Sequence, residues 1–312
     1  MRTPIHLLLP FLAGCHVFAS GDIPVTCDDL DDCGTLGGGD SGLPAADPEL
    51  TLSVGLALSM SDGETWLAGI YDPPDLSPRI EKGGTGGTSG AVAWSEDRKR
   101  LYVADGGVLY VYGPSEADIG QFALPTTEAI VDIQPYDQSV FLITTSWIIV
   151  QATPNAEPVI LNDNGDGLDL VALTADESLV YVISDGDTDG PDLFAYDPST
   201  DEAYPMAKDF DSNGARIGGD IFVGPDNTLM SCSLVGAIYS VDELLSGSAD
   251  PTIYAFLETS VEDVITCGYD AGQDSYLVIS ASEGLFVLGP EGDEVNASLT
   301  SGGQALGGAY IY

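Results

Sequence analysis

Basic residues and histidine are scarce in this sequence. Its 312 residues include 50 Asp and Glu but 8 Lys and Arg, for a formal net charge of −42, and His6 and His16 are the only histidines. So few cations cannot neutralise phosphates, which excludes nucleic-acid binding through a basic patch and electrostatic docking on anionic lipid. Both histidines lie near the N-terminus, outside the expected folded domain. The sequence therefore argues against a Ser-His-Asp or Cys-His catalytic arrangement and against a His-ligated zinc site, because each needs an imidazole in the folded domain.

Long apolar runs are also missing. No segment after the N-terminus reaches the roughly 18 apolar residues in a row that a transmembrane helix needs. Yet 44% of the residues are hydrophobic and 19% are charged, so the chain is not a disordered acidic tail and can bury a large core. The 38 glycines and 14 tyrosines favour many short strands joined by tight turns.

The N-terminus carries a processing signal, MRTPIHLLLPFLAGC, in which Arg2 precedes an apolar run too short to span a bilayer. It resembles a bacterial lipoprotein signal, whose lipobox ends in LAGC as this one does at Cys15. The resemblance implies export through the general secretory route, cleavage after residue 14, and acyl chains such as palmitate on Cys15. Several chains would anchor the protein stably in the cell envelope, at the outer membrane. An ordinary secretory signal with an incidental cysteine is the alternative.

Four cysteines remain after Cys15. Cys27 and Cys33 lie close together, whereas Cys232 and Cys267 lie far away in strand-like segments. An even number in an exported chain predicts two disulfides, Cys27–Cys33 and Cys232–Cys267. Two buried free thiols are the alternative for the second pair.

A unit of three short apolar runs, followed by a weaker fourth, recurs along the chain. It begins near Ser89, Ala129, Leu168, Gly218 and Val261, at spacings of 40, 39, 50 and 43 residues. Four strands every 40–50 residues are typical of a β-propeller blade. A β-sandwich or a β-helix is the alternative. The only helical segment expected is a short one near Val241.

The two ends of the chain complement each other. Residues 51–88 match the second to fourth strands of a blade, and LGGAYIY at 306–312 matches the missing first strand. We therefore expect an all-β, six-bladed propeller over 49–312, closed by pairing of the N- and C-terminal strands; five or seven blades are the alternatives. It would follow a signal peptide (1–14) and a lipidated cysteine with a flexible Gly/Asp-rich tether (15–48).

Segments such as WSEDRKRLYVADGGVLYVYGP resemble propeller repeats of the NHL, YVTN and gluconolactonase-like kind. The resemblance implies the fold and little about activity. Gluconolactonase-like enzymes hold a divalent cation in the central tunnel with Glu, Asn and Asp side chains, but these ligands do not map onto this sequence residue by residue.

The sharpest local motif is DFDSNGARIGGD, which has the spacing of a calcium-binding loop. Asp209, Asp211 and Asn213 occupy positions 1, 3 and 5, Ala215 would offer its carbonyl at position 7, and Asp220 stands at position 12 in place of Glu. Two weaker stretches have similar spacing: Asp185, Asp187 and Asp189, and Asn162, Asn164 and Asp166. The propeller topology predicts that all three stretches emerge on one face around one blade. Carboxylates crowded there would repel one another unless a cation neutralised them, so Ca²⁺ is the expected ion. The alternative is that these residues simply form turns.

Three functions remain open. The first is an envelope lipoprotein whose propeller is a non-catalytic module that binds a protein or a glycan. The second is a metal-dependent propeller hydrolase resembling lactonases, in which carboxylates and metal-bound water replace histidine. The third is a scaffold in outer-membrane assembly. Carboxylates and amides converging in the central tunnel would favour the hydrolase, whereas an aliphatic and aromatic lining would favour binding.

Overall fold

The computed structural model describes the chain from residue 52 to residue 312, apart from short internal gaps. All described residues belong to one compact unit. The gaps are 73–75, 86–89, 115–117, 138, 145–146, 152–158, 164–169, 177–178, 185–192, 198–199, 201, 208–219, 234–235, 246–251, 258–260, 262, 290–293 and 300–304. The predicted signal peptide, Cys15, the tether and the Cys27–Cys33 pair lie outside the described residues.

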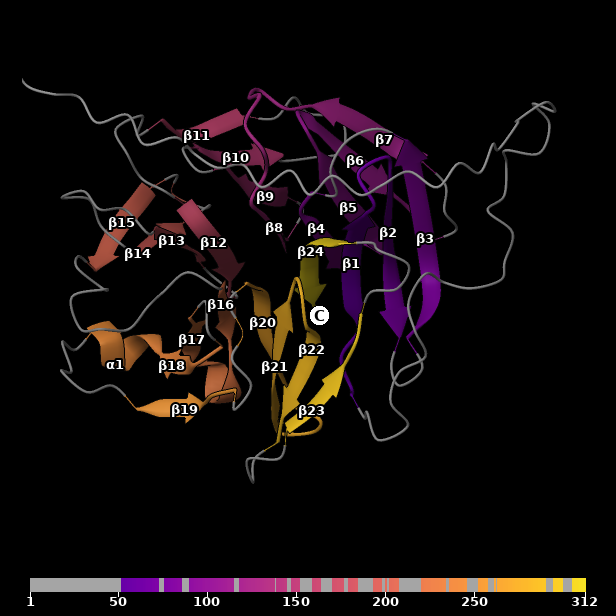
Figure 1. Cartoon of the computed structure of the whole chain (residues 1–312). Coiled ribbons are helices and arrows are strands. Elements are labelled where there is room, and N and C mark those ends of the chain that lie inside the picture. Colours follow the sequence, from indigo (N-terminus) through magenta and orange to yellow (C-terminus); the bar gives the residue numbers. More distant parts are fainter. Residues whose placement is uncertain are drawn as a thin grey trace, which may run out of the picture. The chain divides into compact units, whose positions relative to one another are not determined.

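Six four-stranded antiparallel sheets make up the described part of the chain (Figure 1). Five are continuous in sequence, and we number them as blades 1 to 5. Blade 1 contains β4 (Val92–Ser95), β5 (Arg100–Asp105), β6 (Val108–Tyr112) and β7 (Asp118–Ala123). Blade 2 contains β8 (Asp132–Tyr136), β9 (Ser139–Ile143), β10 (Trp147–Gln151) and β11 (Val159–Asp163). Blade 3 contains β12 (Leu170–Ala175), β13 (Val180–Ser184), β14 (Leu193–Asp197) and β15 (Glu202–Ala207).

Blades 4 and 5 follow the same order of strands. Blade 4 contains β16 (Asp220–Val223), β17 (Leu229–Cys232), β18 (Ile238–Ser240) and β19 (Ile253–Ala255). A 3₁₀ turn, Pro225–Asn227, joins its first two strands, and the predicted short helix is present as α1 (Val241–Leu245). Blade 5 contains β20 (Val264–Asp270), β21 (Ser275–Ser280), β22 (Gly284–Leu288) and β23 (Glu294–Ala297).

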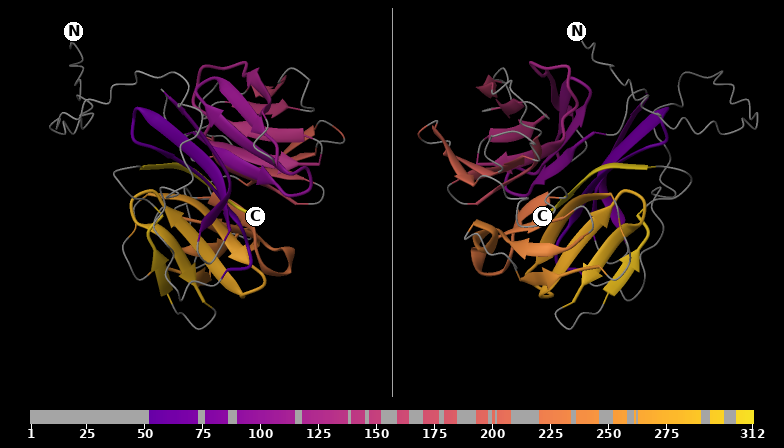
Figure 2. Two further views of the ribbon diagram at one scale, coloured as in Figure 1. Left: turned by 90° about the vertical axis from the view of Figure 1, so that its right-hand side faces the viewer. Right: turned by 60° about the vertical axis from the view of Figure 1, so that its left-hand side comes forward.

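Blade 6 is built from both ends of the propeller. Its order is β24 (Ala305–Ile311), β1 (Leu56–Ser61), β2 (Thr65–Asp72) and β3 (Ser77–Thr85). β24 and β1 pair antiparallel, with Leu56 opposite Ile311 and Ser61 opposite Ala305. In both views of Figure 2 the yellow C-terminal strand lies beside the indigo strands of the same sheet. The predicted β-propeller and its closure are therefore confirmed.

The first strands of the blades surround a common centre. Each of β4, β8, β12, β16, β20 and β24 contacts the first strand of the next blade, and β24 returns to contact β4 (Figure 1). The inner edge of each first strand has no further strand to pair with, so its backbone N–H groups need other acceptors.

Hydrophobic cores lie between the blades. Among the described residues, each of six buried clusters joins two consecutive blades around the ring. Successive side chains of a strand point to opposite faces, so neighbours in sequence belong to different cores. Leu56 and Leu58 pack against blade 5, whereas Ala57 between them packs against blade 1. Both faces of each sheet are thus buried, which explains why the strands read as continuous apolar runs.

One disulfide crosses the seam between blades 4 and 5. Cys232, on β17, is bonded to Cys267, on β20, with a Cα–Cα distance of 6.5 Å. Both residues are buried. The second predicted pairing is therefore confirmed, and the alternative of two free thiols is wrong.

Candidate functional site

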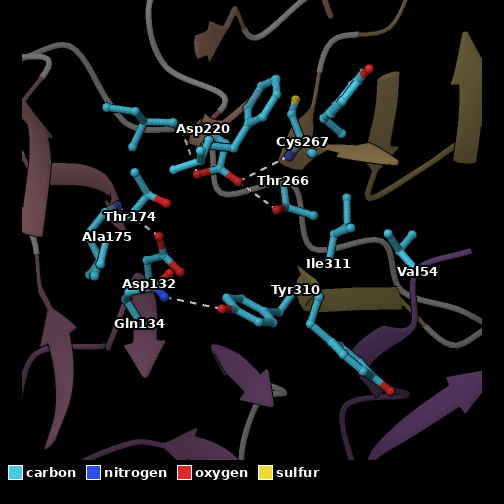
Figure 3. A pocket seen from close by; sticks show the side chains of 17 residues that line it. Val54, Asp132, Gln134, Thr174, Ala175, Asp220, Thr266, Cys267, Tyr310 and Ile311 are labelled. Atoms are coloured by element: carbon cyan, nitrogen blue, oxygen red, sulfur yellow. Dashed lines mark hydrogen bonds between the residues drawn. The ribbon is translucent and has the colours of Figure 1, made fainter. Parts of the chain in front are cut away.

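A cavity of about 240 Å³ lies at the centre of the ring, among the first strands of blades 2 to 6 (Figure 3). The segment that leads into β1 contributes one lining residue, Val54. The remaining lining residues are Asp132, Gln134, Leu173, Thr174, Ala175, Asp220, Ile221, Phe222, Val223, Thr266, Cys267, Gly268, Tyr269, Tyr310, Ile311 and Tyr312. Because five blades supply these side chains, the cavity exists only in the closed ring.

Asp132 enters the cavity from blade 2, where it is the first residue of β8. Its carboxylate accepts the N–H of Ile133 at 2.7 Å and the N–H of Leu173, on the first strand of blade 3, at 2.9 Å. These donors belong to inner strand edges, which no further strand can pair. Asp132 therefore satisfies two edge N–H groups and joins two blades at once.

Asp220 repeats this arrangement two blades further on, in blade 4, as the first residue of β16. Its carboxylate accepts the N–H of Ile221 at 2.7 Å. From the first strand of blade 5 it also accepts the Thr266 hydroxyl at 2.5 Å and the Cys267 N–H at 3.0 Å. Asp220 is buried, whereas Asp132 is partly exposed to the cavity.

The two carboxylates influence each other's ionisation. Burial raises the pKa of Asp132 to about 6, although the N–H groups of Leu173 and Ile133 act in the opposite direction. Burial and then the negative charge of Asp132 raise the pKa of Asp220 well above its ordinary value. Loss of hydration disfavours the charged form of a carboxyl group, and so does a nearby like charge.

A tyrosine and an amide complete the polar wall. The Gln134 side-chain amide donates to the Tyr310 hydroxyl at 3.2 Å and to the Pro135 carbonyl at 2.9 Å (Figure 3). Burial raises the pKa of Tyr310 to about 12, and the charges of Asp132 and Asp220 add to the effect. Tyr310 therefore stays a neutral phenol at physiological pH. In Figure 3 its hydroxyl and both carboxylates are turned toward the same space.

A second, more open cavity of about 430 Å³ lies beside the closure of the ring. Arg79, on β3, lines it together with Asp72, Glu96 and Tyr312. The Arg79 guanidinium lies over the Trp94 ring at 5.3 Å and donates to the Tyr312 hydroxyl at 2.8 Å. It also forms ion pairs with Asp72 at 3.8 Å and with Glu96 at 3.6 Å. Because these two carboxylates already balance its charge, we interpret the cluster as a brace between blades 6 and 1.

Exposed apolar side chains gather on blade 4. Ile253, Tyr254 and Phe256, on and beside the outermost strand β19, are 51%, 46% and 60% exposed. An exposed sheet edge with apolar side chains can pair or pack with another chain. We refer to these three residues as the β19 patch.

The residues predicted from calcium-loop spacing fall largely outside the described residues. Asp209, Asp211, Asn213 and Ala215, the set Asp185, Asp187 and Asp189, and the pair Asn164 and Asp166 all lie in the gaps. The backbone of Asn162 lies in β11, opposite Ile148. Asp220 begins β16 and accepts hydrogen bonds across the seam between blades 4 and 5. The described residues contain no group of three or more His, Cys, Asp or Glu that could hold a metal ion, and no helix there is long and apolar enough to cross a membrane.

No protein-family model and no curated protein matches the chain. Among solved structures it is similar to a chain in the crystal structure of a nidogen/laminin complex, with a TM-score of 0.62 and 11% identity, over 83% of this chain and 98% of that one. It is also similar to virginiamycin B lyase from Staphylococcus aureus, with a TM-score of 0.50 and 12% identity, over 70% and 71% of the two chains. The fold is a β-propeller. At these identities the likeness shows the fold alone.

The sequence prediction did not place Asp132 and Asp220 in one cavity. A signal for this placement is present, because an Asp-Ile pair opens the first apolar run of two units, at 132–133 and at 220–221.

Proposed function

We propose that this chain is a lipid-anchored protein of the cell envelope whose propeller is a non-catalytic binding module, with the central cavity as its ligand site. The observation that carries the proposal is the cavity itself. It is concave and formed within the closed ring, and most of its lining residues are apolar or aromatic, with a few polar side chains among them. Preformed concave sites with a few convergent polar groups are the usual form of ligand sites.

The lipid anchor rests on the sequence alone. The lipobox that ends at Cys15 supports attachment to a membrane. The disulfide between Cys232 and Cys267 is consistent with an oxidising compartment, because such bonds persist in exported proteins. The ligand would be a protein or a glycan of the envelope, and a scaffold role in outer-membrane assembly is the special case in which it is an assembly component.

One observation favours the alternative of a hydrolase. Asp132 and Asp220 both line the cavity, and the pKa of Asp132 is raised to about 6, which suits a general acid or base. Two features weigh against this alternative. Both carboxylates already accept backbone N–H groups. The two are also the only acidic residues among the described lining of the cavity.

The first test concerns the anchor. The full chain and a Cys15→Ser variant are expressed in a bacterium that processes lipoproteins. We expect the wild-type chain in the membrane fraction, with a mass increased by acyl chains, and the variant in the soluble fraction. Equal distribution of the two chains would overturn the anchor.

The second test concerns binding. The full chain is used as bait on detergent-solubilised envelope, beside an Asp132→Asn variant and an Asp97→Asn control in an exposed turn. We expect a captured component that Asp132→Asn loses and Asp97→Asn keeps. A Phe256→Ser variant separates the cavity from the β19 patch, and loss of capture only in this variant would overturn the cavity as the binding site. Turnover of lactone or ester substrates by the wild-type chain, abolished by Asp132→Asn, would favour the hydrolase.

A further inference from the structure

We propose that the central cavity binds a cationic nitrogen group, an ammonium on an alkyl chain, with Asp132 and Asp220 as its acceptors. This inference rests on the proposed function, since it names the chemistry of the group that the cavity would take. The ammonium would belong either to a free amine or to a lysine side chain of a bound protein.

Charge is the first argument. The described residues that line the cavity include two carboxylates and no Lys, Arg or His. Two like charges in a buried site repel each other, and a bound ammonium relieves that repulsion.

The remaining acceptor capacity is the second argument. A bound ammonium favours the ionised form of both carboxyl groups, and two ionised carboxylates offer about eight lone-pair positions. Asp132 accepts two hydrogen bonds and Asp220 accepts three within the described residues. Roughly three positions therefore remain for further donors, and an ammonium carries three donors and no acceptor. A calcium ion requires six to eight oxygen ligands, which these partly occupied carboxylates do not supply.

The rest of the wall suits the carbon chain of such a ligand. Phe222, Val223 and Ile311 line the cavity beside the polar groups, and so do the rings of Tyr269 and Tyr310. Apolar walls around a few fixed acceptors favour a group with an apolar stem and a charged head. An aromatic face adds attraction for a cation.

The experiment is calorimetric titration of the full chain in 150 mM salt with Nα-acetyl-lysine amide and with putrescine. Nα-acetyl-norleucine amide, which lacks the charge, is the neutral probe. We expect both amines to bind and the neutral probe to bind at least tenfold more weakly. Asp132→Asn and Asp220→Asn should each weaken amine binding at least tenfold, whereas Asp97→Asn, which removes one exposed carboxylate, should leave it unchanged.

A second measurement needs no variant, in case the substitutions disturb folding. Intermolecular nuclear Overhauser effects on the wild-type chain should connect the ε-methylene protons of Nα-acetyl-lysine amide with the Tyr310 ring. Contacts only with surface residues would overturn the proposal, and so would amine binding that both Asn variants retain.

The possible failures are distinguishable. Equal binding of the neutral and charged probes, lost in Asp132→Asn, would leave the cavity as a ligand site and refute the ammonium. No binding of any probe, together with envelope capture that does not depend on Asp132, would refute both proposals. Binding of the lysine amide but not of putrescine would indicate that the bound ammonium belongs to a lysine side chain of a protein. Binding of putrescine but not of the lysine amide would indicate that it belongs to a free amine.

Discussion

Asp132 and Asp220 open the first strands of two blades that a single blade separates, and each carboxylate accepts the backbone N–H of a residue on the first strand of the following blade. The two carboxylates thus make equivalent hydrogen bonds between blades, Asp132 between blades 2 and 3 and Asp220 between blades 4 and 5. Their negative charges meet in the cavity between these strands, so the contacts that join the blades also concentrate charge at the centre.

The first prediction follows from the raised pKa of Asp132. A carboxyl with a pKa of about 6 in the folded chain and about 3.9 in the unfolded chain stabilises the fold fully below pH 3.9, and that contribution is lost as the pH rises through 6. Between pH 4 and pH 7, Asp132→Asn should gain roughly 2 to 3 kcal/mol of unfolding free energy relative to the wild type. Urea unfolding at the two pH values measures this difference. Asp97→Asn should show no such change, and an equal offset of Asp132→Asn at both pH values would contradict the prediction.

The second prediction concerns the disulfide between blades 4 and 5. Cys232 and Cys267 are 35 residues apart, so their bond restricts the unfolded chain and should contribute on the order of 3 to 4 kcal/mol. Thermal unfolding with and without a reducing agent tests it. The wild-type melting temperature should fall on reduction, and a Cys232→Ser/Cys267→Ser variant should already be low and insensitive to the reductant. A Cys27→Ser/Cys33→Ser variant is the matched control, and its melting temperature should still fall on reduction.

The third prediction concerns the brace at the ring closure. Arg79→Met removes the cation over Trp94 and Tyr312 but keeps an unbranched side chain, and it should cost about 1 kcal/mol. For a chain of this size the melting temperature should fall by roughly 2 to 4 °C. Arg100→Met, which makes the same change at the start of β5 on blade 1, should have a smaller effect. An equal loss in the two variants would assign the effect to net charge rather than to the brace.

The fourth prediction concerns calcium. If the loop that contains Asp209, Asp211 and Asn213 binds Ca²⁺, adding the ion to chelated protein should raise the melting temperature by several degrees, because only the folded chain would offer the site. Differential scanning calorimetry measures the change. Asp211→Ala should abolish the rise, whereas Asp187→Ala, in a weaker stretch, should reduce it less. No rise in the wild-type chain would refute the site.

The fold could be predicted from the sequence because each of blades 1 to 5 is formed by one continuous stretch of the chain. The strands of such a blade follow one another within about 45 residues, and runs such as those from Ser275 to Ser280 are apolar on both faces since both are buried. The closure could also be predicted, since the incomplete unit at 51–88 and the extra strand at 306–312 need each other.

The cavity could not be predicted in the same way. Its lining residues come from five blades, and only the closed ring brings Asp132 and Tyr310 together. The spacing of DFDSNGARIGGD predicted Asp220 as the last ligand of a calcium loop. In the structure Asp220 is buried at the start of β16, and its carboxylate accepts hydrogen bonds from Thr266 and Cys267. Sequence spacing records what lies along the chain, whereas this site depends on contacts across blade seams.

The pairing of β24 with β1 also determines the order in which the molecule can assemble. Blades 1 to 5 each contain a complete set of strands as soon as they are synthesised, but β1 to β3 must wait for β24, which is separated from them in sequence by the five other blades. Contacts between distant segments form slowly because a long loop must close first. Ring closure should therefore be the slow step of refolding, and until it occurs the open edge of β1 is the part of the chain most prone to pair with another molecule.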